Sequence, residues 1–382
     1  MSPLPPLRFP SLPFPRRRGI ALGLGLALAL SYANFGLRTL ARRCAPGPPA
    51  RGESRGAFRV HTTRSDGRGT LDEVVAAAHA AGLQFVVVAD QDRVTPAEEG
   101  YRDGVLVVEA MEASTRFGQL VVLGLSRPLD EDESACDPLG AVEGLGGAAV
   151  LAHPQDPQRP FRAFGRGATW RGMEVFSNDA SWQKALAEEA YGRLLLAALE
   201  LPFDGGRAVL DVASPPTSEL VRFDLETAAA RRAGRRPGPV LLCAADARGF
   251  PSYRAAFASV SMHVPVALTG DGPADARAVT AALLDGSAAC VMDGRGALAR
   301  ARLRGGADPD LVLETRSRVA DASVRLVRDG WVLGERPLLL PAGETRLALR
   351  SFCEGPCAPG DYRLELRRGG AVWVFTNVVR IE

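Results

Sequence analysis

The sequence is poor in lysine, histidine and cysteine. Lys184 is the only lysine among 46 basic residues, so arginine carries almost all of the positive charge. The 382 residues include six cysteines, too few for a scaffold built on disulfides, and four histidines. No glycine-rich nucleotide loop and no nucleophile elbow appears, so the sequence lacks the usual signals of dinucleotide-binding proteins and serine hydrolases. Hydrophobic residues make up 46% and charged residues 24%, which is typical of a globular chain.

Positive charge is concentrated at the amino end. Residues 1–56 contain nine arginines and one acidic residue, whereas the formal net charge of the whole chain is only +2. The remainder of the chain is therefore acidic overall. A body of that sign argues against nucleic acid as a partner.

The amino-terminal region has the features of a membrane-targeting segment. Residues 1–18 are Pro-rich and basic, with Arg16–Arg18 directly before an uncharged apolar run at 19–37. A run of about 19 residues is near the minimum that crosses a bilayer. Ser31-Tyr32-Ala33 resembles a signal peptidase site, so a retained anchor and a cleaved signal are rivals, and the uncharged extension to Leu37 favours the anchor. We expect one N-terminal hydrophobic helix, with the globular part membrane-anchored or secreted.

A linker at 38–56, rich in Pro, Gly and Arg, leads to a stretch that organises the rest of the chain. Phe58 to Gly67 reads FRVHTTRSDG, a short buried strand followed by a turn. Because side chains alternate along a strand, Arg59 and His61 are predicted to project on the same side. Thr70 is placed to cap a helix that begins at Leu71.

Several later stretches repeat this pattern of an apolar run that ends in polar residues. They are QFVVVADQD at 84–92, VLVVEAME at 105–112 with GQLVVLGL at 118–125, AAVLAHP at 148–154, and PVLLCAADAR at 239–248. In a parallel α/β barrel, the carboxyl ends of the strands carry the chemistry. The polar residues at these ends are therefore predicted to share one site.

This series, in this order, resembles the polymerase-and-histidinol-phosphatase (PHP) superfamily, and most closely its CehA/McbA-like metallohydrolases. The resemblance spans roughly residues 57–293. It implies an α/β fold, a distorted (βα)7 TIM-like barrel, here at 57–296. In that family, histidines and carboxylates hold up to three divalent metal ions for hydrolysis of phosphoesters.

The chain departs from the family at several ligand positions. It keeps the ligand types at five of them, His61, Asp66, Glu112, His153 and Asp246. It has replacements at four others, where Arg59 stands for the first His, Gln91 for the His of Thr-Asp-His, Gln119 for the His of Gly-His, and Arg248 for the closing His. His79 and His263 fall outside the motifs, so the full metal set of the family cannot be assembled.

Three interpretations of this altered site follow. His61, Glu112, His153 and Asp246 would suit one zinc, manganese or iron ion and single-metal hydrolysis. Arginines at two ligand positions instead favour salt bridges in place of metals, and hence weak or no catalysis, which is the interpretation we prefer. A module that binds a small phosphorylated or otherwise anionic ligand is the third alternative.

From about residue 297 the pattern changes to short alternating segments separated by Gly, Pro and Asp turns. These predict a small antiparallel β-sandwich at 297–382. Cys353 and Cys357 in this region are placed to form a disulfide in an oxidising compartment. Earlier in the chain, Cys243 and Cys290 are expected as core residues of apolar strands. The stretch Ser181 to Leu201 is expected to form one long helix.

Overall fold

The computed structural model describes residues 14–382 except 44–46, 157–158, 165–168, 236–237, 307 and 354. The chain divides into two compact units, Met1–Arg43 and Cys44–Glu382, which are described separately below. The Pro-rich part of the predicted amino-terminal segment, residues 1–13, lies outside the described residues.

The described part of the first unit is a helix, α1 (Phe14–Arg42), which confirms the expected helix around the apolar run. Its leucines are largely uncovered: from 62% to 75% of the surface is exposed at Leu22, Leu24, Leu26, Leu28 and Leu30. Within the described residues, we find no helix with the length and apolarity needed to cross a membrane.

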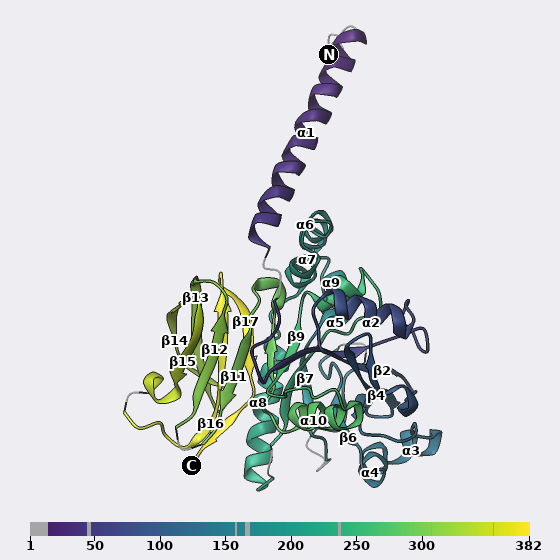
Figure 1. Ribbon diagram of the computed structural model, residues 1–382, viewed down its shortest axis with the longest axis vertical. Helices are drawn as coiled ribbons and strands as arrows, with labels where there is room; N and C mark the ends of the chain where they lie inside the picture. Colours follow the sequence, from purple (N-terminus) through teal and green to yellow (C-terminus); the bar gives the residue numbers. More distant parts are fainter. Residues whose placement is uncertain are drawn as a thin grey trace, which may run out of the picture. The chain divides into compact units, whose positions relative to one another are not determined.

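The second unit is of the predicted mixed α/β class and contains a large curved sheet (Figure 1). Parallel pairs join β1 (Ser54–Val60), β2 (Phe85–Gln91) and β4 (Val105–Thr115). Antiparallel pairs then join β4, β5 (Gly118–Leu123) and β6 (Ala148–Leu151), and parallel pairs join β6, β7 (Gly172–Ser177) and β8 (Val240–Ala244).

The end of this series returns to its beginning. The backbone N–H of Ala245 donates to the carbonyl of Phe58 at 2.9 Å, and that of His61 donates to Ala247 at 3.0 Å. The chain beyond β8 therefore bonds to β1, and the sheet closes on itself. Closure brings the carboxyl ends of β1, β4, β7 and β8 to the same end of the ring.

Helices cover the outside of the sheet. The predicted helix after the first strand is confirmed as α2 (Leu71–Ala80), where Thr70 and Glu73 form a reciprocal capping box. The remaining elements of this part are η1 (Pro96–Glu98), β3 (Gly100–Arg102), α3 (Glu131–Cys136), α4 (Pro138–Gly144), α8 (Thr217–Arg232), α9 (Tyr253–Phe257), β9 (Ser261–Val264), α10 (Gly272–Leu284), β10 (Ala289–Val291) and η2 (Asp293–Arg295).

The prediction of one long helix over Ser181 to Leu201 is wrong. The chain forms α5 (Asn178–Ala187) and α6 (Tyr191–Glu200), with a left-handed residue, Glu189 (φ 54°), between them. The break lets α6 pack beside α7 (Gly205–Val212), and these helices share a small core of buried alanines and Val212.

The carboxyl-terminal region forms two antiparallel sheets around a second core. One sheet contains β11 (Arg300–Arg304), β12 (Asp310–Thr315) and β15 (Gly343–Ala348). The other contains β13 (Val319–Arg328), β14 (Trp331–Leu340), β16 (Gly360–Arg368), β17 (Ala371–Thr376) and β18 (Val379–Ile381), and η3 (Leu349–Phe352) follows β15. Strand β14 does not follow the alternating pattern expected for this region, because its side chains are mostly exposed and it contains a glycine and a proline.

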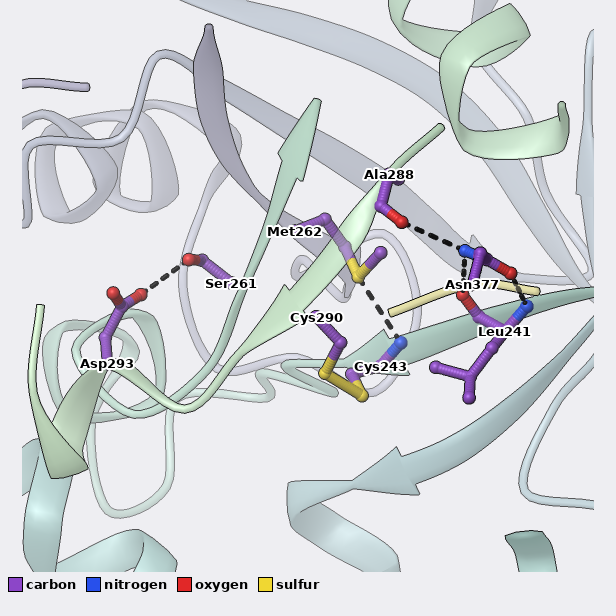
Figure 2. Close-up of a disulfide and its surroundings, with 8 residues drawn as sticks. All are labelled: Leu241, Cys243, Ser261, Met262, Ala288, Cys290, Asp293 and Asn377. Carbon is purple, nitrogen blue, oxygen red and sulfur yellow. Dashed lines mark hydrogen bonds between the residues drawn. A yellow bond between two sulfur atoms is a disulfide. The ribbon is translucent and has the colours of Figure 1, made fainter. Parts of the chain in front are cut away.

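This region is continuous with the ring. Strand β17 pairs with β10, and β10 pairs with β9, so one sheet runs through the predicted boundary at 296/297. Asn377, just after β17, adds a buried clamp (Figure 2). Its Nδ2 donates to the carbonyls of Leu241 and Ala288, each at 3.0 Å, and its Oδ1 accepts from the Leu241 N–H at 2.5 Å.

Two disulfides are present in the part of the chain that the structure describes. Cys243 of β8 and Cys290 of β10 are buried, as expected for core residues, but they are bonded to each other, which was not predicted (Figure 2). Their Cα atoms lie 5.8 Å apart because the fold brings together two strands 47 residues apart in sequence. The expected bridge between Cys353 and Cys357 is confirmed in the structure.

Peptide mapping of the unreduced protein tests both bonds. We expect Cys243 linked to Cys290, Cys353 linked to Cys357, and alkylation of Cys136, which is free and exposed among the described cysteines. Recovery of Cys243 and Cys290 as alkylated thiols from protein collected in an oxidising compartment would contradict the buried bridge.

Candidate functional site

A buried arginine lies at the centre of the candidate site. Arg59, near the end of β1, has no exposed surface. Its guanidinium contacts carboxylates from three other strands or strand ends: Nη1 lies 2.8 Å from Glu112 Oε1, Nε lies 2.9 Å from Glu174 Oε1, and Nη2 lies 2.6 Å from Asp246 Oδ2. One cation therefore ties together β1, β4, β7 and the segment after β8.

Burial and mutual attraction oppose each other in this cluster. Burial disfavours the charged form of Arg59, but Asp246, Glu174 and Glu112 outweigh it and raise the pKa of Arg59 above its usual value. Burial likewise opposes ionisation of Asp246 and Glu112, and the charge of Arg59 nevertheless holds the pKa of both below the usual range. At Glu174 burial prevails and raises the pKa to about 6. The arginine thus stays charged, with Glu112 and Asp246 as its ionised partners near neutral pH.

Two histidines lie against the same carboxylates. Nε2 of the buried His61 lies 3.3 Å from Glu112 Oε2 and 3.4 Å from Asp246 Oδ1, and its Nδ1 lies 3.2 Å from Asp66 Oδ1. His153 Nε2 lies 3.4 Å from Glu112 Oε1. The structure therefore brings together all five residues that keep the ligand type of the family.

Arg248 covers the outer side of the cluster. It is largely buried and forms an ion pair with Asp66. Its Nε lies 3.2 Å from Asp246 Oδ1, and its Nη2 lies 3.6 Å from Glu112 Oε2. The carboxylates of Glu112 and Asp246 thus face one guanidinium on the inside, from Arg59, and a second on the outside.

Three residues of the cluster have a left-handed backbone. The φ angles are 57° at Arg59, 27° at His153 and 41° at Asp246. For residues other than glycine this region typically costs on the order of 1–3 kcal/mol, and such residues concentrate at functional sites. The strand ends are therefore bent in a way that ordinary sheet geometry does not require.

Two of the replaced ligand positions lie elsewhere. Gln91 donates from Nε2 to Ser114 Oγ at 3.1 Å, and Gln119 on β5 is paired in register with that same Ser114. Among the described residues, no hydrogen bond or ion pair links either glutamine to the Arg59 cluster. The remaining histidines also lie outside the cluster, with His79 on α2 and His263 buried on β9.

Sequence reasoning underrated the end of β7. Glu174, which carries no role in the sequence analysis above, binds Arg59, and its second oxygen accepts from the backbone N–H of His153 at 2.9 Å. Ser177 Oγ donates to Asp246 Oδ2 at 2.7 Å. Burial and Asp246 raise the pKa of Asp179, which lies 3.8 Å from Arg248 Nε. The signal was available, because β7 is another apolar run that ends in polar residues.

Two cavities adjoin the cluster. The smaller, of about 50 Å³, is lined in part by His153, Glu174 and Lys184. The larger, of about 220 Å³, is lined by charged and aromatic side chains that include Asp66, Arg68, Asp179, Trp182, Arg248 and Phe250. Acidic and basic groups are mixed in the larger cavity, so it has no single sign of charge.

The side chains present do not fit a divalent metal ion as they are arranged. In the part of the chain that the structure describes, no group of three or more His, Cys, Asp or Glu side chains is placed to hold one. The reason is visible in the contacts: the oxygens of Glu112 and Asp246 already face Arg59 and Arg248. A metal ion would compete for those oxygens with two permanent cations.

Comparisons with known proteins find few likenesses. No protein-family model and no curated protein matches the chain. One similar solved structure is a two-domain protein from Bacteroides vulgatus, described as containing a predicted PHP-like metal-dependent phosphoesterase. It is 11% identical, with 88% of this chain and 99% of that chain covered and a TM-score of 0.39. Another is a proposed metal-dependent phosphoesterase from Bifidobacterium adolescentis, 14% identical, with 53% and 90% covered and a TM-score of 0.29.

Replacement of the central arginine tests the ion-pair network. We expect Arg59→Met to lower the free energy of unfolding at pH 7 by about 3–5 kcal/mol, because Glu112 and Asp246 then lose their buried counter-charge. Without Arg59, their folded-state pKa values rise above those of the unfolded chain. The deficit is therefore largest near neutral pH and shrinks as the pH falls toward 4 and these carboxyls take up protons.

Chemical unfolding of the full chain at pH 7 and pH 5 measures this effect. The matched control is Arg127→Met, which removes an exposed arginine that also pairs closely with a carboxylate, Glu133, at 2.7 Å. We expect a loss below about 1 kcal/mol there. Adding Glu112→Gln and Asp246→Asn to Arg59→Met is expected to recover stability. Equal losses for Arg59→Met and Arg127→Met would show that Arg59 is not a buried centre of charge.

Proposed function

We propose that this chain is a membrane-associated or exported PHP-like protein in which an arginine-centred ion-pair network replaces the metal centre, so that hydrolysis has been lost. The observation that carries the proposal is the position of Arg59. This side chain has no exposed surface and lies 2.6–2.9 Å from three carboxylates, two of which the family resemblance assigns to metal binding.

The fold is consistent with this assignment. We propose that the closed series β1, β2, β4, β5, β6, β7 and β8 corresponds to the distorted seven-stranded barrel of the PHP family, within residues 57–296. The two sheets at 297–382 then correspond to the additional carboxyl-terminal domain. The cluster lies at the strand ends where that family carries out its chemistry.

Electrostatics supports loss of the metal. Arg59 cannot give up its proton in a protein. A doubly charged ion about 4 Å from a guanidinium would be repelled by on the order of 8 kcal/mol at the effective dielectric typical of proteins. Binding of a metal at Glu112 and Asp246 would therefore require both arginines to move away. The ion pairs that now hold them would be lost as well.

The two alternative functions are less favoured. A single-metal hydrolase would use His61, Glu112, His153 and Asp246, but two of these residues are engaged by Arg59 and Arg248. An anion-binding module would use the larger cavity, where Arg248 already pairs with Asp66 and lies 3.8 Å from Asp179, and where Asp246 is a third acidic residue. Arg59 cannot contribute to anion binding, since it is sealed from solvent.

Metal content and phosphatase activity test the loss of chemistry. We expect the purified wild type, dialysed against zinc or manganese, to retain well under one ion per chain and to leave a simple aryl phosphate intact. Restoring the family's ligand type with Arg59→His, Gln91→His, Gln119→His and Arg248→His is expected to produce metal binding. One tightly bound ion per wild-type chain, with hydrolysis abolished by Asp246→Ala, would make the protein an active single-metal hydrolase instead.

Membrane association through α1 is supported by the exposure of its leucines, because a row of uncovered apolar side chains is unfavourable in water. The disulfide Cys243–Cys290 agrees with a location outside the cytoplasm. We expect the protein to sediment with membranes, to resist extraction by high salt and to be released by detergent. Release by salt alone would exclude an anchor, and a mature amino terminus near Asn34 would indicate a cleaved signal.

A further inference from the structure

The outer face of α6 carries no charge. The exposed residues of this helix are Tyr191, Gly192, Leu195, Leu196, Ala198 and Leu199. The large ones are extensively uncovered, from 42% at Leu199 to 64% at Tyr191, and Leu186 at the end of α5 is 56% exposed. Single exposed leucines are ordinary, but a contiguous apolar face usually marks a contact surface. The exposed residues of α6 are called the α6 face below; the exposed Glu188 and Glu189 separate Leu186 from them in the chain.

The distribution of apolar and charged residues on α6 is the reverse of that on a typical surface helix. Its inner side packs through Ala197 and the partly buried Leu194 against the small core shared with α5 and α7. Its two charged residues are not on the α6 face: Glu200 is buried beside Arg207 Nε at 3.3 Å, and the half-buried Arg193 pairs with Glu188 at 3.1 Å. A water-facing amphipathic helix has the opposite arrangement, with large apolar residues inside and charges outside.

The α6 face belongs to the end of the unit at which the amino-terminal helix is tethered. The N–H of Ala50 donates to the carbonyl of Ala299 at 2.8 Å, which fixes the start of the second unit beside β11. Close by in the chain, Arg295 contacts α7 through Asp211 Oδ1 at 3.2 Å and the carbonyl of Leu210 at 3.3 Å. Figure 1 shows α6 stacked on α7 in this part of the unit.

The tether between α1 and this point is short. Helix α1 ends at Arg42, and only residues 43–49 separate it from Ala50. Fully extended, that length spans roughly 28 Å at most. If α1 is embedded in a membrane, Ala50 must therefore remain within about that distance of the lipid, and the contacts of Arg295 connect this part of the unit to α7.

We propose that the α6 face rests in the interfacial layer of a lipid bilayer and forms a second lipid contact besides α1. This inference rests on the proposed membrane association of α1. Uncharged leucines with a tyrosine at one end suit the boundary between headgroups and acyl chains. Two contacts fix the orientation of the globular unit on the membrane, which a single tether does not.

Depth-dependent quenching tests the proposal in the full chain. Leu195→Trp is reconstituted into phosphatidylcholine–phosphatidylglycerol vesicles with and without brominated acyl chains, and the emission of wild-type protein is subtracted. We expect the added emission to shift to the blue and to be quenched by brominated lipid. The matched control is Leu339→Trp, at a 55% exposed leucine on the edge strand β14, whose emission should be unaffected.

The outcomes separate this inference from the proposed function. An unquenched Leu195→Trp in protein that stays on the vesicles after an alkaline wash would overturn the α6 contact and leave the α1 association standing. If Leu195→Trp is quenched but the alkaline wash releases the protein from the vesicles, the α6 contact would be supported and the α1 anchor contradicted. Self-association that Leu195→Ser abolishes, without quenching of Leu195→Trp, would show that a second copy covers the α6 face and would also overturn the proposal.

Discussion

The charge of Arg59 constrains the whole carboxyl end of the ring. A guanidinium with no exposed surface must have its charge compensated inside the protein, and no single carboxylate satisfies all of its donors. Glu112, Glu174 and Asp246 do so together, and they arrive on different strands. The relative positions of β1, β4, β7 and β8 are therefore coupled through one side chain. Such networks contribute less to net stability than their contacts imply, because desolvation opposes them, and they act mainly against alternative arrangements.

Much of the site follows from the sequence, because parallel strands bring their carboxyl ends together. That rule places His61, Glu112, His153 and Asp246 in one cluster, and strand alternation places Arg59 beside His61. The rule does not predict whether a side chain extends into the cluster at the end of the ring. Gln91 ends β2 and Gln119 lies near the start of β5, and both lie beside Ser114, away from the cluster. The left-handed backbone at Arg59 and Asp246 also changes the direction of their side chains. This conformation could not be predicted from the sequence, since neither residue is glycine.

Other features depended on tertiary contacts that local pattern does not contain. The bond between Cys243 and Cys290 requires β8 and β10 to lie together although 47 residues separate the two cysteines. The break between α5 and α6 requires Glu189 to adopt a positive φ so that α6 can pack on α7. In the apolar stretch of α6, Leu195, Leu196 and Leu199 are exposed, although their residue type favours burial. Strand β17 and Asn377 likewise make the carboxyl-terminal sheets part of the same compact unit as the ring, which a change in sequence pattern at residue 297 conceals.

The single lysine gives this protein an unusual chemical simplicity. Lys184 lies on α5 and lines the small cavity beside His153 and Glu174. A reagent specific for amines therefore has one side-chain target. A fluorophore attached there would report on changes at the end of the ring that carries the Arg59 cluster. A lysine-specific endoprotease likewise has one cleavage point in the chain, between β7 and β8. Both disulfides lie on the carboxyl-terminal side of that point, so the two fragments would stay together only through their packing, their shared strand pairs and the charges around Arg59.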